Sequence, residues 1–481
     1  MAEIVPLNKS IIQEAAACVR LAFLRVRDRN QKEKADVSAS DEIRLMYGIK
    51  VGQKAREQFP GGKLIQADNF AGALAETRTA LGSGEEIIFE AAFAFDGVAM
   101  KADILRRRKE NEFDLFEVKS GTDPGNYFED VAIQVWIPKN LGIKVHPYLM
   151  VIDTSATTES KSLFQTIDCR REVRELLPEI EKRIKAIQKT VRAGKIPDVP
   201  FTRACRDCDY FGECLPGLPD HHVFTLYRGG KKIDCLLNRG VLSLDSVPAD
   251  MGLSDRQAVQ VQTIISGKPW RSADLRRELN AAIVYPLYFL DFEAVMDPIP
   301  EYPNQRPYEV TPFQWSFHVQ HSATVEPEHQ EFLKDGPGDP RPAFVESLLR
   351  CVGDSGSIIV YSTFEQTALK KLGDAIPAAK PRITKLLPRL FDLHAVIREN
   401  FYHPEFRGSF SIKQVLPVLV PELSYDKLEV GDGMEAVRAY YRLAWGALPP
   451  AEHAALSTSL RKYCKLDTLA MVKVYQALKE L

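Results

Sequence analysis

Phe113-Asp-Leu-Phe-Glu-Val-Lys119 predicts a β-strand that presents a carboxylate and an ammonium group on one face, because residues two apart in a strand point the same way. The strand expected just before it, over 98–106, carries Asp103. Carboxylates on adjacent strands can hold Mg²⁺, and Lys119 beside Asp103 and Glu117 can orient the attacking water and balance phosphate charge. Surface ion pairing is the simpler alternative for so short a pattern.

The segments around this strand predict a mixed α/β region over 1–217. They comprise strands over 86–95, 98–106, 113–119 and 145–152, a helix over 129–141 and a long amphipathic helix over 173–191. Glu90 on the first strand could complete the acidic cluster as a metal ligand. Gln134 lies on the helix that follows Lys119, where it could take part in catalysis.

A second acidic constellation lies in the C-terminal part of the chain. Leu290-Asp291-Phe292-Glu293 ends an apolar strand, so its two acids share a face and can be offered to a pair of metal ions. Near the end of the chain, Tyr463 and Asp467 lie one helical turn apart. A tyrosine with its ordinary pKa of about 10 would orient a water molecule rather than deprotonate it.

The elements around these acids predict a second α/β domain over 281–481, after a small helical connector over 218–280. Strands are expected over 285–290 and 357–361, a half-buried strand over 312–320, and helices over most of 434–481. The stretch 297–312 holds five prolines and predicts an irregular loop. Glu365 opens a helix after the strand at 357–361 and is a further candidate ligand, with Asp392 as its alternative.

Three of the eight cysteines fall within ten residues, in the pattern Cys205-x2-Cys208-x5-Cys214. A thiolate cluster this tight predicts a bound Zn²⁺ ion or an iron–sulfur cluster, and spacing alone does not separate the two. The remaining positions, apart from the distant Cys18, are expected to be ordinary core thiols: Cys169, Cys235, Cys351 and Cys464.

Composition predicts a globular protein without a membrane span. Of 481 residues, 45% are hydrophobic and 27% are charged, and no apolar run approaches the ~18 residues that a span needs. The stretch 1–10 lacks the pattern of a signal peptide, so a cytoplasmic location is expected. The formal net charge of −2 means that any contact with nucleic acid requires local basic grooves.

The N-terminal motifs, Asp103 with Glu117-x-Lys119, resemble the PD-(D/E)xK nucleases of the RecB-like type over roughly 10–217. The resemblance implies a restriction-endonuclease-like fold. Cys18 followed by the C-x2-C-x5-C motif is similar to the CRISPR-associated and AddB kinds of these nucleases, which implies a [4Fe–4S] cluster on Cys18, Cys205, Cys208 and Cys214. Many such relatives carry a histidine on the first helix, which the stretch 48–57 lacks.

The C-terminal motifs resemble DEDD-type 3′–5′ exonucleases of the ribonuclease H-like (DnaQ-like) fold, tyrosine subclass. The resemblance implies Asp291, Glu293, Glu365 and Asp467 as ligands of Mg²⁺ or Mn²⁺, with Tyr463 catalytic. The stretch 408–417, the proline-rich loop and 312–316 also resemble a bacterial domain family without assigned function that joins the two nuclease-like regions. In the stretch 408–417, Lys413 could contact phosphate; the alternative is that it is a solvated residue at the start of a helix.

Together these features predict a metal-dependent nuclease with two hydrolytic sites and a nucleic-acid substrate, DNA in preference to RNA by resemblance alone. The main rival is a nucleic-acid-binding or scaffold protein in which one or both sites have decayed. Two departures motivate that rival: the absence of the histidine, and the presence of glutamate at position 365. A zinc-stabilised interaction module is a third class.

Overall fold

The computed structural model describes residues 7–29, 38–280, 283–426 and 428–481, and the chain divides into two units. Unit 1 comprises residues 1–200 and 297–308, and unit 2 comprises 201–296 and 309–481. The sequence places the three-cysteine motif in the first region, whereas this division assigns it to unit 2. Residues 1–6, used to exclude a signal peptide, and residues 281–282, where the predicted C-terminal domain begins, lie outside the described residues.

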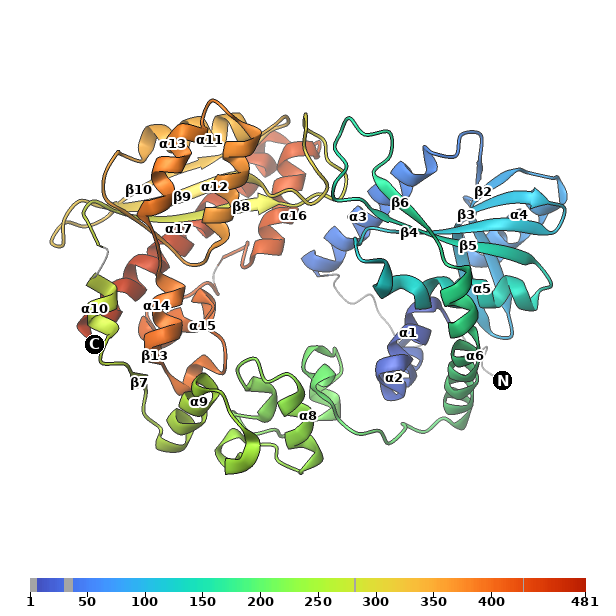
Figure 1. The fold of residues 1–481 in the computed structure, drawn as a ribbon, viewed down its shortest axis with the longest axis horizontal. Helices are drawn as coiled ribbons and strands as arrows, with labels where there is room; N and C mark the ends of the chain where they lie inside the picture. The colour runs from blue at the N-terminus through green and yellow to red at the C-terminus, as the bar shows by residue number, and fades with distance from the viewer. Residues whose placement is uncertain (1–6, 30–37, 281–282, 427) are drawn as a thin grey trace. The chain divides into compact units, whose positions relative to one another are not determined.

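Unit 1 is built on a six-stranded mixed sheet whose strands lie side by side in chain order (Figure 1). The β4–β5 pair is parallel and is connected by helix α5, while β2, β3 and β4 pair antiparallel. The strands are β1 (Lys63–Leu64), β2 (Ile87–Phe95), β3 (Val98–Lys109), β4 (Glu112–Lys119), β5 (Lys144–Ile152) and β6 (Phe164–Asp168). The mixed α/β prediction is confirmed for this part of the chain.

Helices cover both faces of this sheet. One face carries Leu105, Leu115 and Leu149 and packs against helices α1, α2, α4, α5 and α6. The other face carries Phe89 and Phe116 and packs against α3. The helices are α1 (Lys9–Ala17), α2 (Val19–Arg29), α3 (Ala39–Arg56), α4 (Phe70–Gly82), α5 (Phe128–Asn140) and α6 (Arg170–Ala193). Since side chains alternate along a strand, Asp103 and Glu117 belong to the first of these faces.

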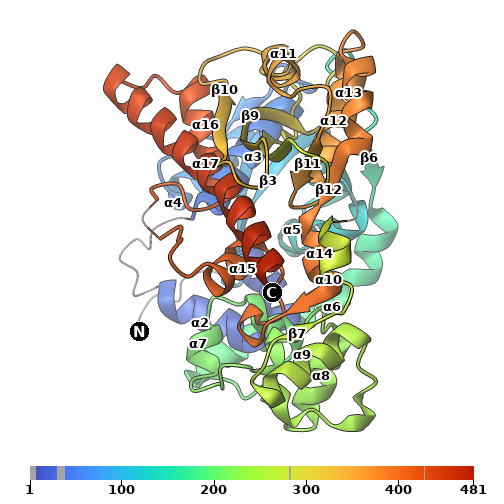
Figure 2. The same ribbon diagram turned by 90° about the vertical axis from the view of Figure 1, so that its left-hand side faces the viewer.

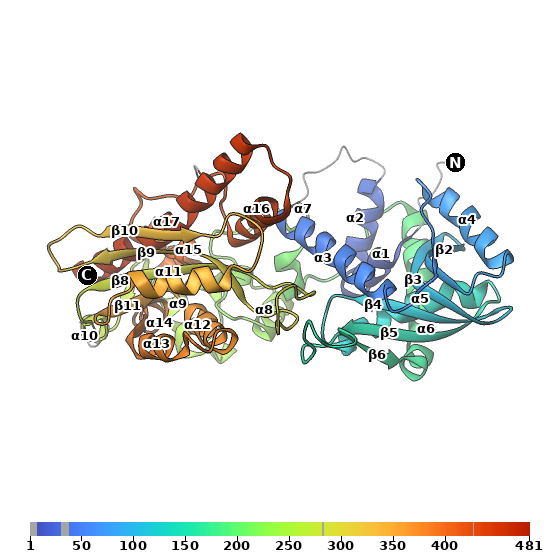
Figure 3. The same cartoon turned by 90° about the horizontal axis from the view of Figure 1, so that it is seen from above.

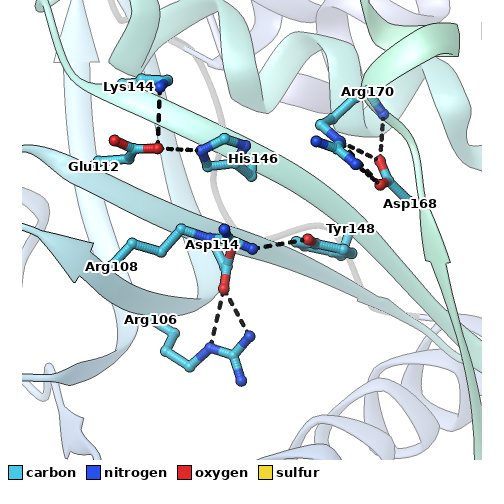
Figure 4. A network of polar contacts seen from close by, with 9 residues as sticks. All are labelled: Arg106, Arg108, Glu112, Asp114, Lys144, His146, Tyr148, Asp168 and Arg170. Atoms are coloured by element: carbon cyan, nitrogen blue, oxygen red, sulfur yellow. Dashed lines mark hydrogen bonds and ion pairs between the residues drawn. The ribbon is translucent and has the colours of Figure 1, made fainter.

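A network of polar contacts ties together strands β3 to β5 on the face that carries Phe116, and a separate pair joins Asp168 to Arg170 (Figure 4). Arg106 donates two hydrogen bonds to the buried carboxylate of Asp114, at 2.7 and 3.1 Å, and Arg108 binds the other oxygen. Glu112 on β4 lies 3.0 Å from the ammonium group of Lys144 on β5. These charges therefore stabilise strand pairing on the face away from Glu117.

The proline-rich loop belongs to unit 1. Within 297–310 the structure has no helix or strand, as predicted, and β9 begins at residue 311. The amide oxygen of the buried Gln305 accepts hydrogen bonds from the backbone of Glu301 and Tyr302 at 2.9 and 3.1 Å. The hydroxyl of Tyr308 donates to the carbonyl oxygen of Ser120, one residue after Lys119. The loop is thus fixed to the end of β4.

Unit 2 begins with short helices around a small apolar core. Val223, Phe224 and Leu236 are fully or almost fully buried there, and Cys205 packs against them. The elements are η2 (Arg203–Asp207), α7 (Phe211–Cys214), η3 (Val223–Thr225), α8 (Lys231–Asn238), η4 (Leu244–Ser246), η5 (Ala249–Met251), α9 (Asp255–Ser266), β7 (Trp270–Arg271) and α10 (Leu275–Asn280). The short helices predicted over 218–280 are present, and they belong to unit 2 together with the C-terminal sheet.

The rest of unit 2 is a five-stranded mixed sheet in the order β10-β9-β8-β11-β12. The strands are β8 (Leu287–Val295), β9 (Thr311–Gln320), β10 (Glu328–Leu333), β11 (Ser357–Val360) and β12 (Leu390–Asp392), and β13 (Phe401–Tyr402) pairs with β7. The helices are α11 (Arg341–Cys351), α12 (Phe364–Ala375), α13 (Lys380–Leu386), α14 (Leu393–Asn400), α15 (Ile412–Leu419), α16 (Gly433–Trp445) and α17 (Pro450–Glu480).

Helix α17 lies on one side of this sheet, and α11 and α12 lie on the other (Figure 2, Figure 3). The packing agrees, since Phe289 contacts Tyr475 of α17 while Phe292 contacts Phe344 of α11. Odd-numbered positions of β8 therefore face α17. No helix of the described residues is long and apolar enough to cross a membrane.

Two predictions about these strands need correction. Strand β8 continues to Val295, so Asp291 and Glu293 lie within the strand and not at its end. All ten residues of β9 are buried, although their alternating pattern predicted a half-buried strand. The polar side chains of β9 are covered because α17 packs over them, and His318 and Ser316 form hydrogen bonds of 2.9 and 3.0 Å with Thr468.

Candidate active sites

Three acidic residues lie in a row across neighbouring strands of unit 1. Ile104 of β3 pairs with Phe116 of β4, so the next two positions are Asp103 and Glu117. The register of β2 with β3 places Glu90 opposite Asp103 in the same way. Glu90 has a φ of 58°, which interrupts regular pairing at this point. The three positions are therefore adjacent in the sheet, but their carboxylates do not form a group of oxygens within 4.8 Å, and Glu90 lies 3.5 Å from Arg56 of α3.

The Glu117 carboxylate is the centre of this site. It is buried, and its Oε1 atom lies 2.9 Å from the ammonium nitrogen of Lys119. Lys9 of α1 places a second ammonium group 2.5 Å from the same oxygen. The side-chain amide of Gln134 donates to Oε2. Lys119 and Gln134 thus lie where the sequence predicted, whereas Lys9 was not predicted.

Asp130 of α5 is a second acid that the sequence analysis did not select. Its buried carboxylate contacts Lys119, lies 3.8 Å from the ammonium of Lys9 and accepts a hydrogen bond from Gln13 of α1. The sequence contained one signal for it: Asp130 precedes Gln134 by one helical turn, so the two side chains lie on the same face of the helix.

The carboxyl groups of Asp103 and Glu117 have pKa values shifted in opposite directions. Burial, followed by repulsion from Glu117, raises the pKa of Asp103 well above its usual value. Burial also opposes ionisation of Glu117, but the charges of Lys9 and Lys119 outweigh it and lower its pKa. Burial opposes the charge of Lys119, yet Glu117 and Asp130 outweigh it and raise the pKa of that ammonium group. Glu117 and Lys119 are therefore held as an ion pair.

The acids of unit 2 come from one strand and one helix. Asp291 and Glu293 project from β8, and Asp467 projects from α17, so that one oxygen of each lies within 4.8 Å of the others. No other such group of three acidic, histidine or cysteine ligands occurs among the residues that the structure describes. Within those residues, none of the three carboxylates forms an ion pair with lysine or arginine.

The three acids resist ionisation. Burial, then repulsion from Asp467 and Glu293, raises the pKa of Asp291 well above its usual value. Burial, then repulsion from Asp467, does the same for Glu293. Burial raises the pKa of Asp467 to about 6, although hydrogen bonds from Tyr425 and Tyr463 and the charge of Lys413 oppose this rise.

Two tyrosines border Asp467. Tyr463 is buried one turn before it on α17, and burial, with the nearby charge of Asp467, raises the pKa of the phenol. Tyr425, which the sequence analysis did not select, donates from its hydroxyl to Asp467 at 2.7 Å. Both phenols therefore stay protonated at neutral pH and act as hydrogen-bond donors.

Lys413 lies beside the same tyrosines. Its ammonium group donates to the carbonyl oxygen of Gly431 at 2.7 Å and lies 5.5 and 5.2 Å from the ring centres of Tyr425 and Tyr463. The residue is half-buried, not a fully solvated helix start. Its charge lowers the pKa of Glu293 in opposition to burial. It is the cationic side chain that accompanies this acidic site.

Glu365 occupies the first turn of α12. It is 3% exposed, and its Oε2 atom has no hydrogen-bond partner. Burial raises its pKa to about 8, and its charge in turn raises the pKa of Asp291. It lies outside the group whose oxygens meet within 4.8 Å. The alternative, Asp392, caps helix α14 by accepting from the backbone of Ala395 at 3.0 Å.

The cysteines fall into three settings. Cys18 directly follows α1 in unit 1. In unit 2, Cys205 lies on η2, Cys208 directly follows η2 and Cys214 ends α7, and the Cys205 sulfur accepts from the backbone of Thr202 at 3.5 Å. Cys169 and Cys464 are buried, as expected of core thiols, and Cys351 is half-buried, but Cys235 is exposed, contrary to that expectation. The buried Cys464 thiol also lies 3.8 Å from Asp291, a contact that was not predicted.

Comparison with known proteins relates only part of the chain to others. The family model described as "Domain of unknown function (DUF2779)" matches residues 288–411, which include Asp291, Glu293 and Glu365. The chain is 26% identical over 143 residues to "Uncharacterized protein UU173" of Ureaplasma parvum serovar 3, a match that covers 26% of this chain and 21% of that protein. The match thus spans about a fifth of that relative's length. No solved structure matches.

Proposed function

We propose that this protein is a metal-dependent nuclease whose principal site is the carboxylate group of unit 2. The observation that carries the proposal is the approach of Asp291, Glu293 and Asp467 within 4.8 Å without an ion-pairing lysine or arginine among the described residues. Burying several carboxylates without a counter-charge is costly, and a divalent cation is the usual compensation. Hard oxygen donors suit Mg²⁺ or Mn²⁺.

Asp291, Glu293 and Asp467 would hold the cation, with Glu365 as a further ligand. A divalent cation in such a site supplies positive charge that lowers the pKa of water and stabilises a phosphate. The protonated phenol of Tyr463, beside Asp467, would donate to the attacking water or to a phosphate oxygen and so orient it. Lys413 would add positive charge near the phosphate.

The reaction that this arrangement supports best is 3′–5′ removal of nucleotides. The support comes from the order of ligands along the chain, an acidic pair on β8 and a Tyr-x3-Asp on α17, together with a mixed five-stranded sheet flanked by helices. A ribonuclease H-like (DnaQ-like) fold for this part belongs to the same proposal. DNA is proposed in preference to RNA on the resemblance of the motifs alone.

A second hydrolytic site in unit 1 is supported by a separate observation, the row formed by Glu90, Asp103 and Glu117 with Lys119 beside it. These acids suit Mg²⁺ or Mn²⁺, and Gln134 fixes Glu117. A RecB-like PD-(D/E)xK fold is proposed for this unit. The pairing of Glu117 with two lysines favours the rival in which this site has decayed to a structural ion-pair cluster.

The cysteine motif is proposed to bind a [4Fe–4S] cluster, with Zn²⁺ as the alternative. Its support is the C-x2-C-x5-C spacing of Cys205, Cys208 and Cys214, with the distant Cys18 as the fourth candidate ligand. Four thiolates are a complete ligand set for such a cluster.

Cleavage of end-labelled strands tests the proposal. The full chain is incubated with Mg²⁺ or Mn²⁺ and single- or double-stranded DNA or RNA that carries the label at the 5′ or the 3′ end. We expect 3′–5′ shortening that Asp291→Asn abolishes and Lys119→Ala preserves. If Lys119→Ala lost all cleavage while Asp291→Asn kept it, the principal site would belong to unit 1 instead. A wild-type chain inert on every substrate would favour the binding or scaffold rival.

A further inference from the structure

Unit 2 contains a cavity of about 380 Å³ that the carboxylate site does not use. It lies where the beginning of α9, the β7–β13 strand pair and the end of α14 meet, elements that lie together in Figure 1. None of the four candidate metal ligands lines it. Two carboxylates line it, Asp255 and Glu399, together with the guanidinium groups of Arg256 and Arg398 and the aromatic side chains of Trp270, Tyr402 and Phe410.

Two guanidinium groups and two carboxylates line this cavity, and both guanidinium groups lie against the same carboxylate, that of Glu399. Arg256 forms an ion pair with Glu399, and the Nε atom of Arg398 lies 3.2 Å from the other oxygen of the same carboxylate. Glu399 is thus shared by two guanidinium groups, and among the described residues Asp255 forms no ion pair with either of them. Burial, together with repulsion from Arg398 and Arg228, lowers the pKa of Arg256. The terminal nitrogens of Arg398 have no other partner among the described residues. They are free to bind an anion.

The other side of the cavity is aromatic. Trp270 of β7 and Tyr402 of β13 are paired in register across the two strands. The ring of Phe410 lies 5.7 Å from that of Tyr402, at an angle of 66°. Tyr402 and Phe410 are buried, while Trp270 is half-buried and reaches the opening. A flat apolar ligand could therefore stack within this wall.

We propose that this cavity binds one nucleotide unit, with its base against the aromatic wall and its phosphate on Arg256 and Arg398. Arginine binds phosphate through two parallel hydrogen bonds, and bases of any sequence stack on aromatic side chains. A volume of about 380 Å³ falls within the range of small-molecule sites and leaves room for a base with its sugar and phosphate. The unit is a free nucleotide or a residue of a single strand.

The inference goes beyond the proposed nuclease activity, because it needs no metal and none of the candidate ligands. The cavity is nevertheless joined to that part of unit 2. The carbonyl oxygen of Phe410 accepts a hydrogen bond of 2.9 Å from Tyr361, which lies just after β11 and shortly before Glu365. Because the cavity needs no metal, binding there can be measured in EDTA, where the proposed hydrolysis does not occur.

Calorimetric titration of the full chain in EDTA tests the proposal, with deoxyadenosine 5′-monophosphate, deoxyadenosine, inorganic phosphate and a short oligothymidylate as probes. We expect saturable binding of the monophosphate, and at least about tenfold weaker binding of the nucleoside and of phosphate. Tighter binding of the oligonucleotide than of the monophosphate would assign the site to a strand, and the reverse would assign it to a free nucleotide.

Variants locate the binding. Arg398→Ala and Trp270→Leu should each weaken binding of the monophosphate about tenfold or more, whereas Arg277→Ala, which removes an exposed arginine of α10, should not. Arg398→Lys, which keeps the charge but loses the planar fork, replaces Arg398→Ala if the latter unfolds. Asp291→Asn should bind as the wild type does, so failure of the nuclease proposal leaves this one intact. Absence of saturable binding, or equal affinity in the arginine and tryptophan variants, would overturn it.

Discussion

Replacing Glu365 by glutamine should stabilise the metal-free protein above neutral pH. This carboxyl group is buried, one of its oxygens has no partner, and its pKa rises from 4.5 to about 8 because burial disfavours the charged form. Each pKa unit corresponds to about 1.36 kcal/mol, so keeping Glu365 ionised above about pH 8 costs on the order of 5 kcal/mol. Glutamine has nearly the same shape and no charge.

The sign of the pH dependence follows from the raised pKa. The folded chain holds the Glu365 proton more tightly than the unfolded chain, so the contribution of this group to stability is largest at low pH and falls as the pH rises from about 4.5 to about 8. In Glu365→Gln this contribution disappears. We expect a gain of at least about 2 kcal/mol above about pH 8 and little difference at about pH 5. The expected gain is smaller than the full cost of about 5 kcal/mol because neighbouring groups relax around the wild-type charge.

Chemical denaturation in EDTA at both pH values, followed by a signal from unit 2, measures the effect. Glu346→Gln on α11, an exposed glutamate, is the matched control and should change stability by no more than about 0.5 kcal/mol. If Glu365→Gln is no more stable than the wild type above about pH 8, or if its gain is equal at both pH values, the reasoning about the buried charge is refuted.

Three further predictions concern single side chains. Tyr463→Phe should slow 3′–5′ shortening about 10- to 100-fold while calorimetric Mn²⁺ affinity stays within about twofold, because the hydroxyl orients a reactant and holds no cation; a parallel loss of Mn²⁺ binding would contradict this role. Lys9→Met should lower the free energy of unfolding of unit 1 by about 1–3 kcal/mol, since Glu117 loses one of two ammonium partners; Lys54→Met, which removes a surface ion pair with Glu57, is the control, and equal effects would exclude a special role for Lys9. Anaerobically purified protein should contain about four iron atoms per chain and lose them in Cys208→Ala; stoichiometric zinc without iron would favour the Zn²⁺ alternative.

Local periodicity was sufficient to predict much of the fold. Strands β2, β4 and β5 and helix α5 begin and end within about a residue or two of the predicted bounds, because buried apolar residues dominate them. Edge strand β10, Glu328–Leu333, was missed because five of its six residues stay at least partly accessible and its sequence is mostly polar. In β9 the alternation was recognised but its meaning was wrong, since α17 covers the polar side.

The candidate sites were predictable where spacing alone places residues on one face. Glu117 with Lys119, and Asp291 with Glu293, follow from the two-residue period of a strand. Lys9 lies 108 residues from Glu117 in the sequence, so only tertiary packing brings them together. The same holds for Tyr425 and Cys464, whose partners Asp467 and Asp291 are 42 and 173 residues away.

Titration of the full chain with Mn²⁺ tests most directly whether Asp291, Glu293 and Asp467 form a cation site. Calorimetry compares the wild type with the double variant Asp291→Asn, Asp467→Asn, and Lys119→Ala serves as the control for unit 1. We predict that the wild type and Lys119→Ala share one saturable binding event that the double variant lacks. Equal binding in the double variant, or no saturable binding in a folded wild-type chain, would contradict the assignment of this acidic group as the metal site.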